Sequence, residues 1–569
     1  MISSSNKSIV QAVVNSCLAH GVNDFVLSPG SRNAPFSIAL DEHPEANTLV
    51  IHDERSAAFF ALGMIQQLNR PVAVVCTSGS APLNYYPAVA EAYYQCLPLV
   101  VISADRPEEW IDQGDGQTIV QRELYKNHIR YSCSFGEISY LKKDSWFVER
   151  EMAVAFSMAN GNWKGPIHVN VALSEPLYGT QEYVVTNPKR ISLVRSNFAP
   201  SPEVFEGLKT DWNRKRKMIL VGQSPPSHRL SRLLEALAKD TSIAVLTENT
   251  SNTTVPSGIP CIDRALNVMN EKEVASYQPE ILITVGDAIV SKRIKTFFRA
   301  CQGLEHWKVG FQFPYMDTFQ KLTKSIQATG EEFISFLLKE LHQESNVSNF
   351  GSRWKQLDYL AKDRAHGFLE KVEFSDLNVY DLLFQFIPEG AHLHMANSSV
   401  VRYCQLFDSV PGISYWCNRG TSGIDGSSST AVGAAFASPN VPHVLITGDL
   451  SFFYDSNAFW NKYVPANLRI ILINNGGGGI FDIIPGPRNT KQREKYFVAS
   501  HQFQARELCE GFGLRYLYAS QENDLKNAFE ELFSWKEEQH PTLLEVNTTN
   551  VSNHSVLEDY FRFIRTSDK

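Results

Sequence analysis

The sequence predicts an α/β protein in which three doubly wound parallel-sheet domains follow one another along the chain. Short apolar runs of strand length alternate with longer helical patterns, which is typical of strand–helix units in parallel sheets. A chain of 569 residues is also too long for one hydrophobic core. Polar stretches divide it into three blocks, which we place at residues 1–186, 187–346 and 347–569.

The candidate strands of the first block each end in polar or small residues. They are Asp24–Leu27, Thr48–His52, Val72–Cys76, Leu99–Ile102 and Ile167–Val171. A helix is expected from Glu54 through Leu68, and the proline-punctuated stretch Thr186–Pro202 is the candidate linker to the second block.

The later blocks repeat the same alternation. Their candidate strands are Met218–Val221, Ile243–Leu246 and Ile281–Val285 in the second block, and Val444–Thr447 and Ile470–Ile473 in the third. The polar stretch Gln343–Asn349 separates these two blocks. In doubly wound domains ligands bind beyond the carboxyl ends of the strands, so strand ends are where catalytic residues are expected.

Composition and charge exclude several classes of protein. With 43% hydrophobic and 20% charged residues the chain resembles ordinary globular proteins. A net charge of -8 argues against a general nucleic-acid binder. No apolar run is long enough to span a bilayer, and the 9 scattered cysteines form no C-x-x-C pair. We therefore expect a soluble, cytoplasmic protein, and its charge does not exclude anionic small substrates.

The strongest chemical signal lies in the third block. One strand runs into Gly448-Asp449-Leu450-Ser451, and the next runs into Asn474-Asn475 and a run of glycines. Asp449 and Asn475 offer side-chain oxygens and Gly477 a carbonyl, which together with diphosphate oxygens suit Mg²⁺. Either piece alone is also consistent with a turn or a loop. Together they resemble the metal and diphosphate signature of thiamine-diphosphate enzymes.

Thiamine catalysis also needs a carboxylate that hydrogen-bonds the pyrimidine ring and so promotes formation of the ylid. Glu54 follows the strand Thr48–His52, at the position where such a carboxylate is expected. The alternative is that Asp53-Glu54-Arg55 only opens a helix, which the helix dipole favours. The diphosphate signature elsewhere in the chain favours Glu54 as the catalytic residue.

Further motifs carry a more specific resemblance. They are Ser28-Pro29-Gly30-Ser31-Arg32-Asn33, Asp53-Glu54-Arg55, Ser103-Ala104-Asp105-Arg106-Pro107 and Asn418-Arg419-Gly420-Thr421-Ser422-Gly423-Ile424-Asp425-Gly426. Over essentially the full chain they resemble the family of 2-succinyl-5-enolpyruvyl-6-hydroxy-3-cyclohexene-1-carboxylate synthases. The resemblance implies a carboligase of menaquinone biosynthesis that depends on thiamine diphosphate and Mg²⁺ or Mn²⁺. Such an enzyme decarboxylates 2-oxoglutarate and adds the resulting carbanion to isochorismate. It also implies a homodimer or a dimer of dimers.

The resemblance assigns roles to individual residues. Both substrates carry several carboxylates, which guanidinium groups bind in a bidentate manner. The residues implied in substrate binding are Arg32, Arg106, Gln117, Lys292, Arg293, Ser398, Arg402 and Arg419. Those implied in cofactor binding are Ser78, Gly79, Gly448, Asp449, Leu450, Ser451, Asn475, Gly477, Ile424, Ile480 and Phe481. For any one of the arginines, and for Lys292 and Arg293 on their expected helix, a surface ion pair is the alternative.

Two motifs depart from the family pattern. Asn475-Gly476 stands where an Asn-Asn pair is commoner, although the predicted metal ligand Asn475 is retained. Gly114-Asp115-Gly116-Gln117 stands where the family usually has Gly-Ala-Asn-Gln, so a carboxylate is added near a site for anionic substrates. Two alternatives to the synthase remain. One is another thiamine-dependent 2-oxoacid carboligase or decarboxylase, similar to acetohydroxyacid synthase, although an enzyme for pyruvate needs fewer arginines. The other is a catalytically silent scaffold, whose sequence sign is the loss of Glu54 or Asp449. The middle block lacks Gly-x-Gly-x-x-Gly, so no flavin or nicotinamide is expected there.

Overall fold

The computed structural model describes residues 3–137, 142–184, 186–191, 193–194, 196, 198–342, 348–483, 486–534 and 540–566. The chain forms two compact units, each assembled from separate segments. Unit 1 consists of Met1–Val194, Asn418–His443 and Ser451–Leu468. Unit 2 consists of Arg195–Cys417, Val444–Leu450 and Arg469–Lys569.

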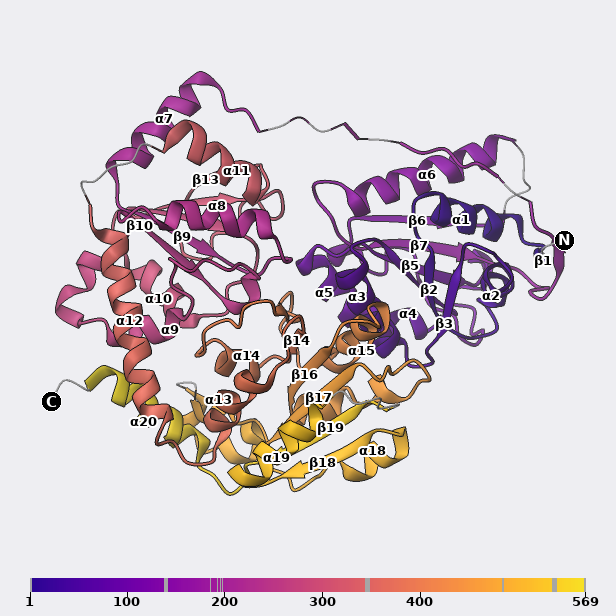
Figure 1. The fold of residues 1–569 in the computed structure, drawn as a ribbon. Helices are drawn as coiled ribbons and strands as arrows, with labels where there is room; N and C mark the ends of the chain where they lie inside the picture. Colours follow the sequence, from indigo (N-terminus) through magenta and orange to yellow (C-terminus); the bar gives the residue numbers. More distant parts are fainter. Residues whose placement is uncertain are drawn as a thin grey trace. The chain divides into compact units, whose positions relative to one another are not determined.

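Unit 1 is built on a six-stranded parallel sheet of order β3-β2-β4-β5-β7-β6. Its strands are β2 (Asp24–Ser28), β3 (Asn47–Val50), β4 (Val72–Cys76), β5 (Leu99–Asp105), β6 (Tyr131–Phe135) and β7 (Ile167–Ala172). Alternate side chains of these strands, such as Val100 and Ile102, join one core cluster beneath helices α1 and α6 (Figure 1). A short antiparallel pair, β1 (Ser3–Ser5) with β8 (Thr180–Glu182), joins the beginning of the first block to its end.

Helices complete unit 1. They are α1 (Ser8–Ala19), α2 (Ala34–Asp41), α3 (Glu54–Leu68), α4 (Ala81–Asn84), α5 (Tyr86–Gln95), α6 (Lys142–Asn160) and α15 (Ser427–Ala437), with short 3-10 helices η1 (Glu108–Trp110), η2 (Lys126–His128) and η6 (Ser456–Phe459). Helices α3 and α15 cross at glycines: a Cβ on Gly63 would lie 2.0 Å from the Thr430 carbonyl oxygen, and one on Gly433 2.0 Å from that of Phe60. Only glycine allows the two backbones to approach so closely.

The first sheet of unit 2 is five-stranded and parallel, of order β10-β9-β11-β12-β13. Its strands are β9 (Lys217–Val221), β10 (Ile243–Thr247), β11 (Ile281–Val285), β12 (Glu305–Val309) and β13 (Leu322–Ile326). Both faces are buried, because Ile219 and Val221 join one core cluster and Met218 and Leu220 join another. The helices around it are α7 (Pro202–Arg214), α8 (His228–Ala238), α9 (Ile262–Val268), α10 (Lys292–Ala300), α11 (Gly330–Phe336) and α12 (Phe350–Leu369), with η3 (Asn249–Ser251), η4 (Glu271–Tyr277) and the π-helical η5 (Leu337–Leu341).

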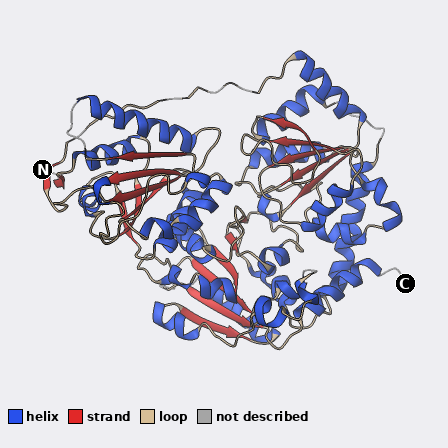
Figure 2. Cartoon of the chain, turned by 180° about the vertical axis from the view of Figure 1, so that it is seen from behind, coloured by secondary structure: helices blue, strands red, loops and turns tan. Residues whose placement is uncertain are grey.

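The third sheet has six strands in the order β15-β14-β16-β17-β19-β18. Its strands are β14 (His392–Met395), β15 (Ser414–Trp416), β16 (His443–Gly448), β17 (Leu468–Asn474), β18 (Arg515–Ala519) and β19 (Thr542–Asn547). The associated helices are α13 (Asp376–Phe386), α14 (Ser399–Cys404), α16 (Asp449–Tyr454), α17 (Ile480–Ile483), α18 (Arg506–Phe512), α19 (Glu522–Leu532) and α20 (Asn553–Thr566), with η7 (Pro487–Asn489) and the π-helical η8 (Arg493–Val498). Figure 2 shows each of the three sheets together with its flanking helices.

The predicted fold class is confirmed, because three α/β sheets follow one another along the chain. Helix α3 has the predicted bounds, and each predicted strand matches an observed strand to within a few residues. The domain boundaries stay predictions, and the one placed between residues 346 and 347 lies outside the described residues. No helix of the described part of the chain is long and apolar enough to cross a membrane.

Candidate active site

The predicted metal motif of unit 2 is assembled at the ends of two neighbouring strands. Strand β16 runs directly into Asp449, and β17 runs into Asn475 and the glycine run. The Asp449 carboxylate is 2% exposed and accepts hydrogen bonds from the backbone N–H groups of Gly476 (2.8 Å) and Gly477 (2.9 Å). The structure therefore brings the three predicted metal ligands together.

Each of these ligands has a defined partner. Burial raises the pKa of the Asp449 carboxyl, while the Leu450 backbone N–H and nearby His501 act in the opposite direction. Asn475 donates its side-chain N–H to Asp376 Oδ2 at 3.0 Å, which leaves its amide oxygen as the ligand atom. The Gly477 carbonyl accepts from the Gly479 N–H at 2.9 Å and retains a second lone pair.

The glycine run packs closely against the C-terminal end of η8. Gly478 donates its backbone N–H to the Val498 carbonyl at 2.7 Å. Gly477 has φ 149°, and a Cβ there would lie 2.6 Å from the same carbonyl oxygen. Ile480 opens α17 and is buried, and the Phe481 ring packs beside Phe497 with centroids 5.6 Å apart. A side chain would fill this cradle, so glycine is required by the packing.

These donors fit the predicted cofactor. A carboxylate, an amide oxygen and a backbone carbonyl form a set of hard oxygen donors, which Mg²⁺ or Mn²⁺ accepts together with phosphate oxygens. Gly476 and Gly477 carry no side chains of their own that would obstruct a diphosphate. Gly448 and Leu450 flank Asp449 on the same turn.

In unit 1, Glu54 is the first residue of α3. Asp53 caps the helix by accepting from the Ser56 N–H at 3.1 Å, and its other oxygen accepts from Asn457 at 2.7 Å. Glu54 is half-buried, and burial raises the pKa of its carboxyl. The adjacent Asp53 raises this pKa further, while hydrogen bonds to the Glu54 backbone and to Asn84 oppose the rise. Glu54 thus holds a proton more readily than an exposed glutamate does.

The predicted cofactor residues Ser78 and Gly79 contact the predicted substrate residue Gln117. The Ser78 hydroxyl donates to the Gln117 carbonyl at 2.9 Å. Gly79 has φ 86°, and a Cβ there would lie 3.0 Å from Gln117 Cα. Gln121 fixes this turn by accepting from the Gly79 N–H at 3.0 Å. The loop that carries Gln117 is therefore hydrogen-bonded to the turn between β4 and α4 and packs closely against it.

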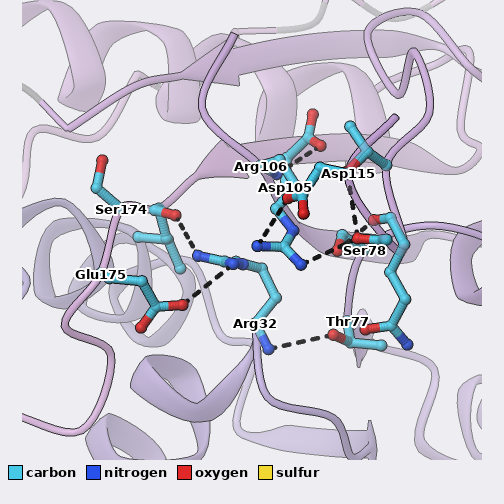
Figure 3. A network of polar contacts seen from close by, with 12 residues as sticks. Arg32, Thr77, Ser78, Asp105, Arg106, Asp115, Ser174 and Glu175 are labelled. Carbon is cyan, nitrogen blue, oxygen red and sulfur yellow. Dashed lines mark hydrogen bonds and ion pairs between the residues drawn. The ribbon is translucent and has the colours of Figure 1, made fainter. Parts of the chain in front are cut away.

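Arg32 and Arg106 lie in the same neighbourhood of unit 1 (Figure 3). Arg32 donates to the Leu173 carbonyl at 2.8 Å and pairs with Glu175 at 3.2 Å. Arg106 donates to the Gly116 carbonyl at 2.9 Å and pairs with Asp115 at 3.2 Å. Burial lowers the pKa of Arg32, and the positive charge of Arg106 lowers it further. The two guanidinium groups are close enough to repel each other.

Two of the predicted substrate residues of unit 2, Arg293 and Arg402, lie near Asp263. Burial raises the pKa of Asp263, and the positive charges of Arg293 and Arg402 oppose that rise. Arg293 donates to Asn267 Oδ1 at 3.0 Å and stacks over the Phe561 ring at 4.1 Å. Lys292, one residue earlier on α10, is exposed.

Ser398 and Arg402 form a local pair at the start of α14. Arg402 donates a hydrogen bond to the Ser398 carbonyl. Ser398 has φ 70° and ψ -125°, a conformation that L-residues rarely adopt. Backbone strain of this kind clusters at functional sites, which agrees with the predicted role of Ser398.

Arg419, Ile424 and Ser451 belong to unit 1. Glu91 accepts from the backbone N–H groups of Gly420 (2.7 Å) and Thr421 (2.6 Å) and so holds the loop that carries Arg419. Ile424 is 40% exposed, and its carbonyl accepts from the Ser451 hydroxyl at 2.7 Å. An exposed apolar side chain on a fixed loop suits the predicted role of supporting a ligand.

The sequence prediction missed residues that support this machinery. Asp376 binds Asn475, Gln121 binds Gly79, and Glu91 binds the Arg419 loop. All three are polar and at most 2% exposed. The sequence alone does not show that a polar side chain is buried when its hydrogen-bond partner is distant in the sequence. For Asp376, its place at the start of an apolar helix pattern is a weak signal of burial.

Comparison with protein families finds thiamine pyrophosphate enzymes along most of the chain. Residues 7–125 match the N-terminal TPP binding domain of thiamine pyrophosphate enzymes, and residues 398–546 match the C-terminal TPP binding domain. Residues 197–395 match the middle domain of the same enzymes.

Curated relatives share nearly the whole length. A 2-succinyl-5-enolpyruvyl-6-hydroxy-3-cyclohexene-1-carboxylate synthase of Flavobacterium johnsoniae is 42% identical, covering 97% of this chain and 98% of the relative. The enzyme of the same name from Porphyromonas gingivalis is 38% identical, with 98% of each chain covered. Among solved structures, benzoylformate decarboxylase from Polynucleobacter necessarius matches with a TM-score of 0.71 at 15% identity, covering 96% of this chain and 99% of that one. At that identity the likeness shows the fold alone.

Proposed function

Because the chain belongs to the family of 2-succinyl-5-enolpyruvyl-6-hydroxy-3-cyclohexene-1-carboxylate synthases, we propose that it decarboxylates 2-oxoglutarate and joins the remaining four-carbon unit to isochorismate, releasing CO2. The observation that carries the proposal is the Asp449 carboxylate held by the Gly476 and Gly477 amides beside Asn475. It supports a metal and diphosphate site. The arginines that the family resemblance assigns to substrate binding favour substrates that carry several carboxylates.

Thiamine diphosphate, when bound, supplies a nucleophilic carbon and accepts the electron pair that CO2 leaves behind. Asp449, Asn475 and Gly477 would hold the Mg²⁺ or Mn²⁺ that anchors the diphosphate, with Gly448, Leu450 and Ser451 shaping the turn. By the family resemblance, Ser78 and Gly79 would also contact the cofactor. Ile424, Ile480 and Phe481 would supply apolar contacts that exclude water from the reacting centre.

Glu54 would exchange a proton with the pyrimidine ring. Burial favours the protonated form of Glu54, so Glu54 would be able to donate this proton to the pyrimidine ring and to take it back afterwards. An exposed glutamate would be ionised and unable to donate. The half-buried position at the start of α3 therefore suits an acid–base role.

The arginines would bind and orient the substrates. We assign Ser398 and Arg402 to the distal carboxylate of 2-oxoglutarate, since only that group distinguishes it from pyruvate. Arg32, Arg106 and Gln117 would bind the carboxylates of isochorismate. The remaining cations, Lys292, Arg293 and Arg419, would add positive charge around the substrates, which carry more than one carboxylate.

The decisive experiment supplies the purified protein with thiamine diphosphate, Mg²⁺, 2-oxoglutarate and isochorismate, and detects the coupled product by mass. Matched reactions omit one component at a time or replace 2-oxoglutarate with pyruvate. Coupling of 2-oxoglutarate to isochorismate supports the proposal. Efficient use of pyruvate with no use of 2-oxoglutarate would instead identify an enzyme similar to acetohydroxyacid synthase. We also propose a cytoplasmic homodimer or dimer of dimers.

A further inference from the structure

Two arginines proposed to bind isochorismate are already paired with carboxylates of the chain itself (Figure 3). Arg106 Nη1 lies 3.2 Å from Asp115 Oδ2, and Arg32 Nη2 lies 3.2 Å from Glu175 Oε1. The Arg106 guanidinium also donates to the Gly116 carbonyl, so the segment Asp115–Gly116 occupies two of its N–H groups. These are the groups that a substrate carboxylate would need.

In both pairs the carboxylate is the more exposed partner. The Arg106 side chain is 22% exposed and that of Asp115 is 37% exposed. The Arg32 side chain is 5% exposed and that of Glu175 is 67% exposed. Each carboxylate therefore approaches its arginine from the solvent side. An ion pair whose carboxylate is this exposed to water is weak, so another carboxylate can replace that partner at little cost.

The loop around Asp115 is suited to such a replacement. Asp115 lies between Gly114 and Gly116, and a Cβ at either glycine would meet no atom within 4 Å. Gly114 has φ 78°, a conformation that other residues adopt with difficulty. Open space and two flanking glycines allow Asp115 to move away from Arg106 while the rest of the loop stays in place.

We propose that Asp115 is an internal counter-ion of Arg106 that an isochorismate carboxylate displaces. This inference rests on the proposed function and extends it to a specificity-determining residue. In the free protein Asp115 balances the mutual repulsion of Arg32 and Arg106. During binding it competes with the substrate, so Asp115 weakens acceptor binding and disfavours acceptors that carry less negative charge.

The test compares the steady-state kinetics of Asp115→Asn with those of the wild type. Asparagine keeps the size of the side chain and removes the competing charge. We expect the KM for isochorismate to fall about two- to fivefold, the range that a weak exposed ion pair allows. The kcat and the KM for 2-oxoglutarate should not change. Asp115→Ala, which restores the residue usual in the family, should give the same shift.

Asp112→Asn is the matched control. Asp112 lies three residues earlier in the same exposed loop and has no ion pair within the described part of the chain. Asp112→Asn removes the same charge as Asp115→Asn. An equal fall in the KM for isochorismate in both variants would therefore indicate a general effect of surface charge and would overturn the inference. A higher or unchanged KM in Asp115→Asn would also overturn it. If the wild type itself forms no coupled product, the proposed function fails first.

The proposed metal ligand Asn475 is held by a buried carboxylate, that of Asp376. Asp376 is 2% exposed and opens α13, and its Oδ2 accepts from the Asn475 side-chain N–H at 3.0 Å. Its Oδ1 accepts from the Thr548 hydroxyl at 2.6 Å, and its backbone N–H donates to Asn553 at 2.7 Å. Asn553 in turn binds Thr548 at 3.2 Å. The carboxylate is thus fixed on both oxygens.

The geometry points to Asp376 as a positioning residue for the proposed metal site. By accepting the N–H of Asn475, it orients the amide so that the oxygen is presented as the ligand. Without this acceptor the amide can rotate and present its nitrogen, which cannot bind a hard cation. Groups that orient metal ligands in this way typically contribute about 10–100-fold to metal affinity.

The test measures Mn²⁺ binding directly, from the electron paramagnetic resonance signal of free Mn²⁺ in the presence of thiamine diphosphate. Asp376→Leu removes the acceptor, and its Kd for Mn²⁺ should rise about tenfold or more. Asp376→Asn retains an oxygen that can accept from Asn475, so it should bind Mn²⁺ within a few-fold of the wild type. Thr548→Val, which leaves Asp376 in place but loosens it, should give an intermediate Kd.

Asp455→Asn serves as the control. Asp455 is a fully buried carboxylate that accepts from Ser429 in unit 1, so its loss tests whether any buried carboxylate has the same effect. An unchanged Kd in both Asp376→Leu and Thr548→Val would overturn the role of Asp376. Binding of Mn²⁺ by Asp376→Asn that is as weak as that by Asp376→Leu would overturn it as well. A wild type that binds no Mn²⁺ with thiamine diphosphate would overturn the metal site itself.

Discussion

Glu54 is the residue whose chemistry is most narrowly defined by its surroundings. It combines a half-buried position with a raised pKa, at the start of a helix whose N-cap is a separate residue, Asp53. Because Asp53 performs the capping, Glu54→Gln should leave α3 and the fold intact. Glutamine cannot exchange the proton, and loss of a general acid–base group typically costs about 10²–10⁴-fold in rate. The check is kcat together with cofactor binding by titration calorimetry; near-normal turnover would remove Glu54 from the mechanism.

Arg402 provides a test of donor selection at the same scale. Pyruvate and 2-oxoglutarate present the same reacting end, so discrimination must come from the distal carboxylate. A hydrogen bond to a charged group contributes about 1.5–3 kcal/mol, so its loss should cost tenfold or more in discrimination. Arg402→Ala should lower kcat/KM for 2-oxoglutarate and leave that for any residual pyruvate reaction nearly unchanged. An unaltered ratio between the two acids would show that Arg402 does not bind the donor.

Residues at strand ends were predictable from the sequence, whereas their supporting partners were not. Asp449 and Asn475 could be located because each directly follows an apolar strand. Asp376 is 99 residues from Asn475 in the sequence, and only folding brings them together. Asp115 was recognised as a departure from the family pattern, but its pairing with Arg106 depends on the path of an irregular loop. Sequence patterns reveal the periodicity of strands and helices, but they do not reveal contacts between side chains that are distant in the sequence.

At the scale of elements, the crossing of α3 and α15 depends on glycines. Gly63→Ala would place a methyl group 2.0 Å from the Thr430 carbonyl oxygen, which belongs to a backbone and cannot move aside locally. Overpacking of this kind costs about 1–3 kcal/mol, so the melting temperature should fall. Gly207→Ala in α7 is the matched control, because nothing lies within 4 Å of its Cβ position. That control should be neutral or slightly stabilising; equal behaviour of both variants in calorimetry would contradict the close crossing.

Apolar strands were predicted well and mixed ones were missed. Strands such as β4 and β11 are continuous apolar runs buried on both faces, which is the clearest signal of a parallel sheet. Strand β12 reads Glu305-His306-Trp307-Lys308-Val309, and β13 at the sheet edge reads Leu322-Thr323-Lys324-Ser325-Ile326. Their charged residues are compensated by tertiary contacts such as Lys324 with Glu305. A pattern of hydrophobicity cannot reveal that compensation.

At the scale of the whole molecule, the two compact units do not coincide with the three blocks predicted from the sequence. The segments Asn418–His443 and Ser451–Leu468 belong to unit 1, although the sequence places them in the third block. Composition and linkers could predict three blocks, because each block has its own strands and helices. They could not predict that part of the third block packs on the first, since this depends on the glycine-mediated contact between α3 and α15.

Assembly can be tested by complementation between two inactive variants. Family resemblance implies a symmetric dimer in which each catalytic site takes Glu54 from one chain and the Asp449 motif from the other. Glu54→Gln and Asp449→Ala should each be inactive as homodimers. A heterodimer of the two, purified through two different affinity tags after co-expression, would then contain one site with both residues intact and one with neither. We expect about half of the wild-type activity per dimer, since one of two symmetric sites survives.

If each site were formed within one chain, every site of the heterodimer would lack one residue and the preparation would be inactive. Light scattering on the same sample reports whether the active species is larger than the 64.0 kDa single chain.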